Sequence, residues 1–400
     1  MKKEVLISVF DMEIGGIERS LINMLESFDY ENYNVSLFVC SHQGEFMNLI
    51  PRQVHLLPEI GAYTVFRKSV AQCLRERRYS AALVRILAKS MASIKARRRR
   101  LVEGPGYIQM QLESRLSVPI IPSFKKEYDL AISYAWPHEI VIRKVRAKKK
   151  VAWIHTDYSK LEIDNQLDLA GWRKFDRIAS ISDACTQSFL FRYPELRDKI
   201  VPIENITSPG FIRSQATEPL HMEISEGPFF NIVSVGRLSF VKGFDTAIQA
   251  LKILHEAGLT DIRWYVVGYG GQKDELRTLI ADNNLQESFK LIGKKSNPYP
   301  YIQRCDLYVQ PSRYEGKAVT VTEAQILGKP IVITNYPTST SQVTNGLDGI
   351  ICEGSPEGIA EAIKRMYTDS ELRESLTNYL KEKNHSNDSE LIKLYDLIPS

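Results

Sequence analysis

The sequence lacks the features of a disulfide-stabilised or membrane-spanning protein. Its five cysteines are widely scattered and form no C-x-x-C pair, which disfavours a disulfide framework and a zinc site. No apolar run approaches the roughly 18 residues that cross a bilayer. The apolar run 5–10 ends at Asp11 and is too short for a secretory signal, so it indicates a first buried strand. We therefore expect a cytoplasmic protein.

Two motifs for charged ligands are also missing. The chain has no D-x-D pair of the kind that carries a divalent metal ion. The glycine-rich stretch 266–271 reads V-V-G-Y-G-G, which lacks the full G-x-G-x-x-G fingerprint and lies late in the chain. A nicotinamide-dependent oxidoreductase is therefore disfavoured, and any phosphate site must rely on basic side chains and backbone amides.

Basic residues are concentrated in one part of the chain, although the formal net charge is only +4. Residues 51–150 contain 22 Lys and Arg against 7 Asp and Glu, whereas the other 300 residues contain 30 against 41. This segregation predicts a local anionic partner. Within it, 65–101 combines basic clusters with apolar residues at helical spacing, which is typical of a helix on an anionic membrane. A solvated face of a packed helix is the alternative, and no nucleic-acid-binding module accompanies the charge.

Short apolar, β-branched runs alternate with amphipathic segments through most of the chain. This alternation predicts an α/β protein whose parallel sheets are covered by helices on both faces. We expect two doubly wound, Rossmann-like domains, at 1–204 and 221–372, joined by a proline-containing linker at 205–220. The tail, 373–400, could pack back on the first domain.

Glycines and basic residues follow several of the expected strands. Gly15 and Gly16 stand between the first strand and the first helix, where backbone amides favour an anion. In the second domain, Gly236 and Arg237 follow the first strand, and Lys242 precedes the next helix. Arg237 offers a planar fork for phosphate oxygens and Lys242 a point charge, so together they suit a diphosphate.

Two glutamates eight positions apart flank the start of another expected helix. Glu315 follows the strand 307–312, and Glu323 lies in the helix 318–328. If the whole stretch were helical, eight residues would rise roughly 12 Å. The carboxylates of glycoside hydrolases lie only about 5 to 9.5 Å apart. The pair therefore suits two ends of an extended ligand better than acid–base chemistry on one bond.

These motifs together resemble the retaining, nucleotide-sugar-dependent glycosyltransferases of family 4. The likeness rests on an E-x7-E motif from Glu315 to Glu323, with the segments GGIE, GR…KG and GYG in the family's order, and covers nearly the whole chain. It implies the GT-B fold, with two Rossmann-like domains facing across a cleft. It also implies a metal-independent hexosyltransferase that requires no cofactor. The donor, a nucleotide-diphosphate sugar and by expectation a UDP-sugar, would bind mostly to the C-terminal domain.

The resemblance also implies roles for single residues. Arg237 and Lys242 would stabilise the leaving diphosphate, Glu315 would contact the donor sugar, and Glu323 would hold the ribose. His155, in the segment WIHTD, matches the family's histidine near the sugar and completes the catalytic set. The expected donor-binding residues are Gly15, Gly16, Gly236, Arg237, Lys242, Gly268, Gly270, Gly293, Lys294, Glu315, Gly316, Lys317, Ala318, Val319 and Glu323.

The implied pathway is the synthesis of a capsule, another surface polysaccharide, a glycolipid or a wall polymer. The acceptor would be a glycan or a polyprenyl-linked glycan held by the N-terminal domain, and the protein would be cytoplasmic or peripheral on the inner face of the cell membrane. A GT-B nucleotide-sugar epimerase and a non-catalytic sugar- or nucleotide-binding subunit of a synthesis complex remain open as alternatives. The family often has Gly-Phe-Gly where this chain has Gly316-Lys317-Ala318, so the pattern does not predict the donor sugar.

Overall fold

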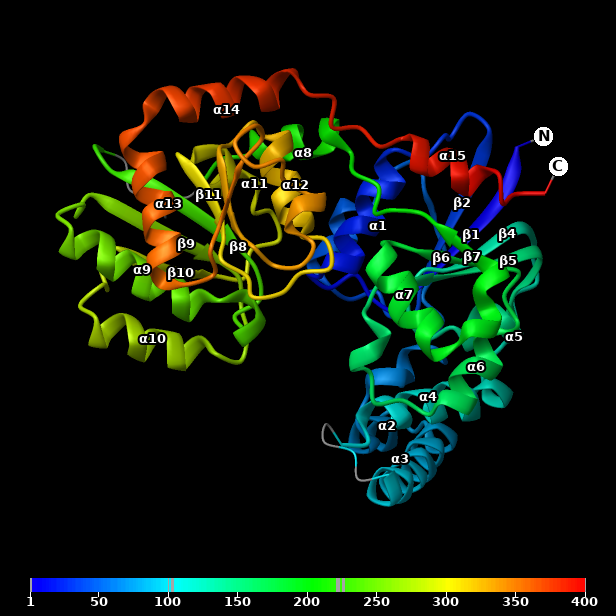
Figure 1. Ribbon diagram of the computed structural model, residues 1–400. Coiled ribbons are helices and arrows are strands. Elements are labelled where there is room, and N and C mark those ends of the chain that lie inside the picture. The colour runs from blue at the N-terminus through cyan, green and yellow to red at the C-terminus, as the bar shows by residue number, and fades with distance from the viewer. Residues whose placement is uncertain (1, 100, 102–103, 221–223, 225–226, 400) are drawn as a thin grey trace. The chain divides into compact units, whose positions relative to one another are not determined.

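The computed structural model describes residues 2–99, 101, 104–220, 224 and 227–399 (Figure 1). The chain divides into two compact units. The first comprises 1–207 together with 387–400, and the second comprises 208–386. Each unit is built around its own parallel sheet.

The first unit contains a seven-stranded parallel sheet in the order β3-β2-β1-β4-β5-β6-β7. β1 lies between β2 and β4, with Val5 opposite both Val35 and Leu130. Residues Val5 to Ile7 have no exposed surface, as expected for a central strand of a parallel sheet. The strands are β1 (Lys3–Val9), β2 (Tyr33–Val39), β3 (His55–Leu56), β4 (Glu127–Ser133), β5 (Arg146–Ile154), β6 (Arg177–Ser180) and β7 (Ile200–Pro202).

The helices of the first unit include one from the end of the chain. In that helix Tyr395 stacks on Tyr33 with ring centroids 4.6 Å apart, and its hydroxyl accepts the Asp29 N–H at 2.8 Å. The helices are α1 (Gly16–Glu26), α2 (Val70–Arg75), α3 (Tyr79–Arg99), α4 (Gly106–Ser117), α5 (Glu139–Lys144), α6 (Asn165–Trp172), α7 (Asp183–Arg192) and α15 (Ser389–Tyr395). Short 3-10 turns are η1 (Glu45–Leu49), η2 (Thr64–Arg67), η3 (Val118–Ile120), η4 (Tyr158–Lys160) and η5 (Pro194–Lys199).

The second unit contains a six-stranded parallel sheet in the order β10-β9-β8-β11-β12-β13. The strand order reverses between β8 and β11, and ligands of such sheets bind outside the carboxyl ends of the strands at this point. The strands are β8 (Phe230–Val235), β9 (Ile262–Val267), β10 (Phe289–Gly293), β11 (Leu307–Gln310), β12 (Ile331–Thr334) and β13 (Ile350–Cys352).

Helices cover both faces of the second sheet (Figure 1). Successive residues of β8 alternate between two cores: Ile232 packs with α9, α10 and α13, and Val233 packs with α8, α11 and α12. The mainly apolar sequence of β8 follows from this burial on both faces. The helices are α8 (Pro209–Ala216), α9 (Phe244–Glu256), α10 (Lys273–Asp282), α11 (Tyr299–Arg304), α12 (Val319–Ile326), α13 (Pro356–Thr368) and α14 (Ser370–Glu382), with 3-10 turns η6 (Phe240–Lys242) and η7 (Ser339–Ser341).

The boundaries between the units differ in detail from those expected. Part of the expected linker 205–220 is the helix α8, whose Ile212 and Ala216 are buried in the core of the second unit. These two residues share one face of the helix because they are four positions apart. The tail 373–400 is divided: 373–386 belongs to the second unit and 387–400 to the first. Among the described residues, no helix is both long and apolar enough to cross a bilayer.

Candidate functional site

The basic residue Lys242 and the carboxylate of Glu315 meet beyond the carboxyl ends of β8 and β11. Lys242 Nζ lies 2.5 Å from Glu315 Oε1, and the lysine side chain lies against Gly236, where an added Cβ would stand 3.4 Å from the Lys242 Cδ. Gly243 makes this meeting possible. Its φ is +66°, and a Cβ there would collide with the backbone carbonyl of Pro311.

Three donors hold one oxygen of Glu315. Besides Lys242, the Ser312 hydroxyl donates to Oε1 at 2.6 Å and the Gln310 amide donates at 3.2 Å. Glu315 is 9% exposed to solvent. Within the described chain its Oε2 has no hydrogen-bond partner. The side chain is therefore fixed in orientation while one oxygen can accept a hydroxyl from a ligand.

Arg237 is exposed and, among the described residues, makes no hydrogen bond or ion pair with its guanidinium. Arg313, in the loop after β11, is in the opposite situation. Its two terminal nitrogens both lie 2.7 Å from the Asp245 carboxylate in a bidentate pair. Arg313 therefore anchors its loop to α9, whereas Arg237 is available to bind an anion in the same fork geometry.

The glycines after β9 have a structural reason to be glycine. A Cβ on Gly268 would collide with the Gly236 carbonyl oxygen, and one on Gly270 with that of Leu238. The Gly236 N–H donates to Val267 O at 3.0 Å across the same contact. The loop after β9 therefore lies directly on the loop after β8, and this contact alone accounts for Gly268 and Gly270.

At the end of β10, the space beside Gly293 is open to a ligand. Gly293 has φ +87°, and nothing lies within 4 Å of the position that a Cβ would occupy. The neighbouring Lys294 ammonium lies 5.4 Å from the centroid of the Tyr269 ring. A flat aromatic ring and a cation at the end of adjacent strands suit an aromatic or anionic group.

The two glutamates of the E-x7-E motif have different surroundings. Glu323 has no exposed surface and accepts a hydrogen bond from the Tyr299 hydroxyl at 2.9 Å. At the start of α12 the Ala318 N–H is already bonded to Gln342 Oε1 at 2.9 Å, while Gly316 has open space around it. In this structure Glu315 is thus placed to meet a ligand, and Glu323 is tied into the core.

In the first unit, a carboxylate lies over the start of α1. A Cβ on Gly15 would collide with the Glu18 carboxylate, whereas Gly16 faces open space. Burial raises the pKa of Glu18 to about 7, and the nearby Asp11 acts in the same direction. The helix N-terminus that the sequence predicts to bind a phosphate therefore already interacts with an acidic side chain.

His155 follows β5 and is neutral at pH 7. Burial lowers the pKa of His155 to about 3. Its Nε2 lies 2.8 Å from the Tyr134 carbonyl oxygen, which can only accept, so Nε2 carries the proton and Nδ1 is the acceptor. The Tyr134 hydroxyl in turn donates to Ser20 on α1 at 2.9 Å. A neutral histidine in this place can accept a hydrogen bond but cannot supply positive charge.

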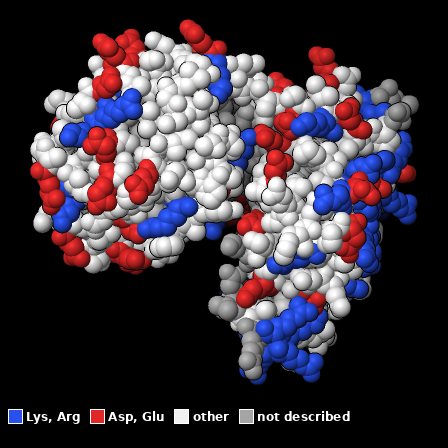
Figure 2. Space-filling model, in the orientation of Figure 1, with Lys and Arg blue, Asp and Glu red and all other residues white. Residues whose placement is uncertain are grey.

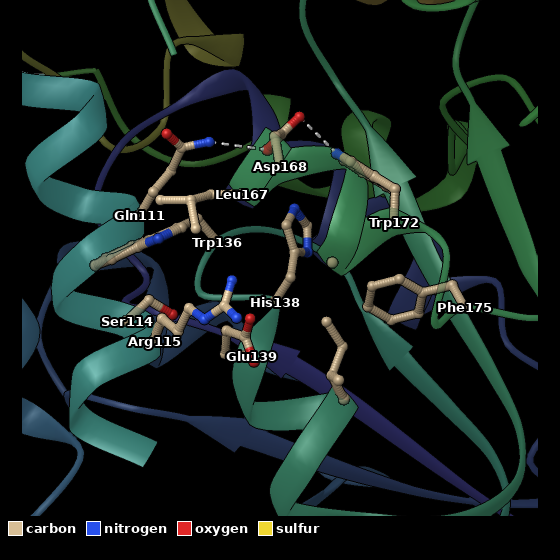
Figure 3. Close-up of a pocket in the computed structure, with 12 residues that line it drawn as sticks. Gln111, Ser114, Arg115, Trp136, His138, Glu139, Leu167, Asp168, Trp172 and Phe175 are labelled. Carbon is tan, nitrogen blue, oxygen red and sulfur yellow. Dashed lines mark hydrogen bonds between the residues drawn. The ribbon is translucent and has the colours of Figure 1, made fainter. Parts of the chain in front are cut away.

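A cavity in the first unit lies between α4, α5 and α6 (Figure 3). Trp136, Trp172 and Phe175 provide aromatic walls. Trp136 Nε1 and Ser114 Oγ are buried atoms of this lining without a hydrogen-bond partner in the described chain, so a small acceptor or water would satisfy them. No sequence pattern indicates this cavity, because its lining residues are spread over 111–175 and share no motif.

Another histidine and a carboxylate line the same cavity. Burial lowers the pKa of His138 to about 4, and its Nδ1 lies 2.8 Å from the Ser133 hydroxyl. Asp168 accepts hydrogen bonds from Gln111 at 3.2 Å and from the Trp172 indole at 3.0 Å, as Figure 3 shows. These contacts fix the polar rim of the cavity. Among the described residues, no cluster of three or more His, Cys, Asp or Glu side chains could hold a metal ion.

Comparison with solved structures defines the class of fold. TarM from S. aureus, solved with UDP and other ligands, has a TM-score of 0.69 at 14% identity, with 100% of each chain covered. HepE from Anabaena, solved with UDP and glucose, has a TM-score of 0.62 at 17% identity, covering 95% of this chain and 94% of that one. The protein has the GT-B fold of two Rossmann-like α/β domains, which confirms the predicted fold class.

Comparison of sequences supports the predicted resemblance over one part of the chain. Residues 223–383 match the family model described as glycosyl transferases group 1, and the resemblance is confirmed over these residues. An N-acetylgalactosamine-N,N'-diacetylbacillosaminyl-diphospho-undecaprenol 4-alpha-N-acetylgalactosaminyltransferase from Campylobacter jejuni is 30% identical over 154 residues, or 38% of this chain and 41% of the relative. CapM from Staphylococcus aureus, a capsular polysaccharide biosynthesis glycosyltransferase, is 30% identical over 158 residues, or 37% and 39%. The matches thus span about two fifths of these relatives.

Proposed function

We propose that this protein is a retaining glycosyltransferase that moves a sugar from a nucleotide-diphosphate sugar, by expectation a UDP-sugar, to a glycan or lipid-linked acceptor. The observation that carries the proposal is the contact between Lys242 and Glu315, together with the exposed Arg237, which directly follows the Gly236 that the Lys242 side chain lies against. A fixed carboxylate with one available oxygen and two cations, at the carboxyl ends of β8 and β11, suits a sugar joined to a diphosphate. The family match of 223–383 and the UDP in the related structures support this donor class.

In this proposal the diphosphate is stabilised by side chains of the second unit. Arg237 binds the phosphate oxygens through its fork, and Lys242 shares its charge between Glu315 and the phosphates. As the bond from the anomeric carbon to the diphosphate oxygen breaks, negative charge grows on that oxygen and both cations stabilise it. No metal ion and no further cofactor is required.

Glu315 then acts on the sugar rather than on the leaving group. Its Oε2 accepts a hydrogen bond from a donor hydroxyl and thereby orients the ring, while Oε1 stays bonded to the protein. The acceptor oxygen attacks the anomeric carbon from the face that the diphosphate leaves. The acceptor's proton passes to the leaving oxygen, so the configuration is retained without a protein base. His155 stays in the proposed catalytic set as a neutral group near the sugar.

The remaining donor contacts stay part of the proposal. Gly293 and Lys294 would lie beside the base, and Glu323 would reach the ribose only after its side chain leaves the hydrogen bond to Tyr299. The other proposed donor-binding residues are Gly15, Gly16, Gly236, Gly268, Gly270, Gly316, Lys317, Ala318 and Val319, with Gly16 bringing its backbone to the distal phosphate. At Gly15 the Glu18 carboxylate must move or be protonated before a phosphate can approach, because two negative groups would otherwise share the helix terminus.

The acceptor and the place of action complete the proposal. We assign a glycan or polyprenyl-linked glycan of a capsule or other surface polysaccharide as acceptor, with the protein cytoplasmic or peripheral on the inner face of the membrane. Two curated relatives support this choice, since one is named for a diphospho-undecaprenol substrate and another for capsular polysaccharide biosynthesis.

A thermal-shift screen of nucleoside diphosphates, nucleotide sugars and NAD tests the donor class, followed by donor hydrolysis and transfer assays with a metal chelator present. We expect UDP to raise the melting temperature and a UDP-sugar to be turned over with chelator present. A non-catalytic subunit would bind UDP without turnover, and an epimerase would convert the donor sugar without transferring it. A response to NAD alone would overturn the proposal.

A further inference from the structure

The longest helix of the first unit, α3, turns its large apolar side chains outward. Ala81, Ala82, Ala88, Ala92 and Ala96 are its buried apolar residues, whereas the large ones on the opposite side are between 42% and 57% exposed. These exposed residues are Leu83, Ile86, Leu87, Met91 and Ile94. This is the reverse of the usual arrangement for a helix that covers a core.

The alanines are sufficient for the packing of α3. Ala88 and Ala92 form a small core with Ile108 and Leu112 of α4. Small side chains let the two helices approach closely, so the leucines and isoleucines of α3 are not needed inside the unit. The exposed residues Leu83, Ile86, Leu87, Met91 and Ile94 instead form an apolar stripe along the outer side of α3. Positions 83, 87 and 94 lie on this side because they are separated by four and seven residues, and they span roughly 16 Å of helix. Contiguous apolar surface of this kind marks an interaction site.

Basic residues accompany the apolar stripe and acidic residues do not. The sequence contains no Asp or Glu from 77 to 102. Arg85 and Lys95 pair with Glu113 and Asp164 and so attach α3 to the rest of the unit. Lys89, Arg97 and Arg98 are exposed and, among the described residues, have no acidic partner. Figure 2 shows Lys and Arg gathered over the end of the first unit that holds α3.

We propose that α3 lies flat on an anionic phospholipid bilayer, with its apolar stripe in the interface and its unpaired basic residues at the headgroups. Such a bilayer offers a hydrocarbon boundary for the apolar side chains of α3 and negative charge for its basic side chains. A second copy of the chain would bring like charges together, and a nucleic acid would leave the aliphatic side chains in water. The surface adds a membrane contact to the proposed function, and its binding does not depend on sugar transfer.

Vesicle co-sedimentation of the full chain tests the proposal, with vesicles of phosphatidylcholine alone or mixed with phosphatidylglycerol. We expect binding to the anionic vesicles that weakens with added salt, and little binding to the neutral ones. The combined substitution Leu83→Ser, Leu87→Ser and Ile94→Ser should weaken binding at least tenfold. So should Lys89→Ala, Arg97→Ala and Arg98→Ala. Phe191→Ser, at a side chain of the same unit that is also exposed, is the matched control and should bind as the original chain does.

The outcomes separate this inference from the proposed function. Arg237→Ala should bind vesicles normally, and the α3 variants, whose substituted side chains are exposed, should keep their fold and their melting-temperature response to UDP. Unchanged vesicle binding in both α3 variants, or no binding by the original chain at low salt, would overturn the inference. A dimer that is lost with the serine substitutions would show that a second copy covers the stripe instead.

Discussion

Lys242 and Glu315 are joined by an ion pair of 2.5 Å although 72 residues separate them in the chain. Both lie in segments that follow strands at the point where the strand order of the second sheet reverses. The pair leaves one glutamate oxygen without a partner in the described chain. The Lys242 side chain lies against Gly236, and the next residue, Arg237, makes no hydrogen bond or ion pair with a described residue. This relationship is the structural basis of the proposed donor site.

Glu315→Gln keeps the size of the side chain and removes its charge. We expect the transfer rate to fall by about 100-fold, a typical effect of losing one oriented polar group from an active site. UDP should still bind, because the substitution leaves both cations in place. Initial-rate measurements check this, with Glu361→Gln, an exposed residue of α13, as control. Equal rates for both variants would contradict the assigned role.

Glu323→Ala should destabilise the second unit instead. The side chain has no exposed surface, and its loss leaves the Tyr299 hydroxyl without this buried partner. We expect a loss of about 1 to 3 kcal/mol in the free energy of unfolding, measured by urea denaturation. Glu361→Ala should change it little. If Glu323→Ala weakened nucleotide binding with unchanged stability, a direct ribose contact would be the better account.

Gly243→Ala should affect both stability and nucleotide binding. A Cβ there meets the Pro311 backbone, and the φ of +66° is itself unfavourable for alanine. We expect the free energy of unfolding to fall by about 1 to 3 kcal/mol. UDP should also bind more weakly, because Lys242 directly precedes this turn. Gly258→Ala is the matched control, since Gly258 has φ +87° with nothing near its Cβ position. It should lose stability only and keep its UDP affinity.

Because His138 and His155 are buried, we expect the free energy of unfolding to fall in acid. The pKa of His138 is about 4 in the folded protein, below its ordinary value of 6.5, because burial disfavours the charged form. Between these values the unfolded chain binds a proton that the folded chain does not, so stability falls as the pH drops from about 7 towards 4. The contribution is at most on the order of 3 kcal/mol.

His138→Gln should flatten this pH dependence, as measured by urea denaturation from pH 7 to pH 5. His155 has its pKa shifted in the same direction and keeps part of the slope. Glu18, with a pKa raised to about 7, opposes it, since its folded form retains a proton longer. His55→Gln, at an exposed position, is the control and should leave the slope as it was. An identical slope in both variants would show that His138 titrates normally.

The fold class could be predicted because the central strands of each sheet are buried on both faces. Ile232 and Val233 point into different cores, so both must be apolar, and the resulting short runs are visible in the sequence. The meeting of Gly236, Lys242 and Glu315 follows similarly from the rule that strand ends share one edge of a parallel sheet. Their roles in binding a donor remain predictions.

Other features depend on side-chain packing that no periodic pattern reveals. Helix α8 lies in a stretch whose prolines and polar residues indicated a linker, because only Ile212 and Ala216 needed to be buried. The Glu18 carboxylate lies against Gly15 because of the rotamer that the Glu18 side chain adopts, and the sequence does not indicate this rotamer. In α3 the sequence shows helical spacing of apolar residues, but only the structure shows that alanines face inward and leucines outward.

Calorimetric titration of UDP in the presence of a metal chelator tests the central claim most directly, namely that Arg237 and Lys242 of the second unit hold a diphosphate. The account predicts that the original chain binds UDP, that Arg237→Ala weakens binding by about tenfold or more, and that Arg277→Ala, at an exposed arginine of α10, leaves it unchanged. Equal UDP affinity in the Arg237 and Arg277 variants, or binding only when a divalent metal is supplied, would contradict it.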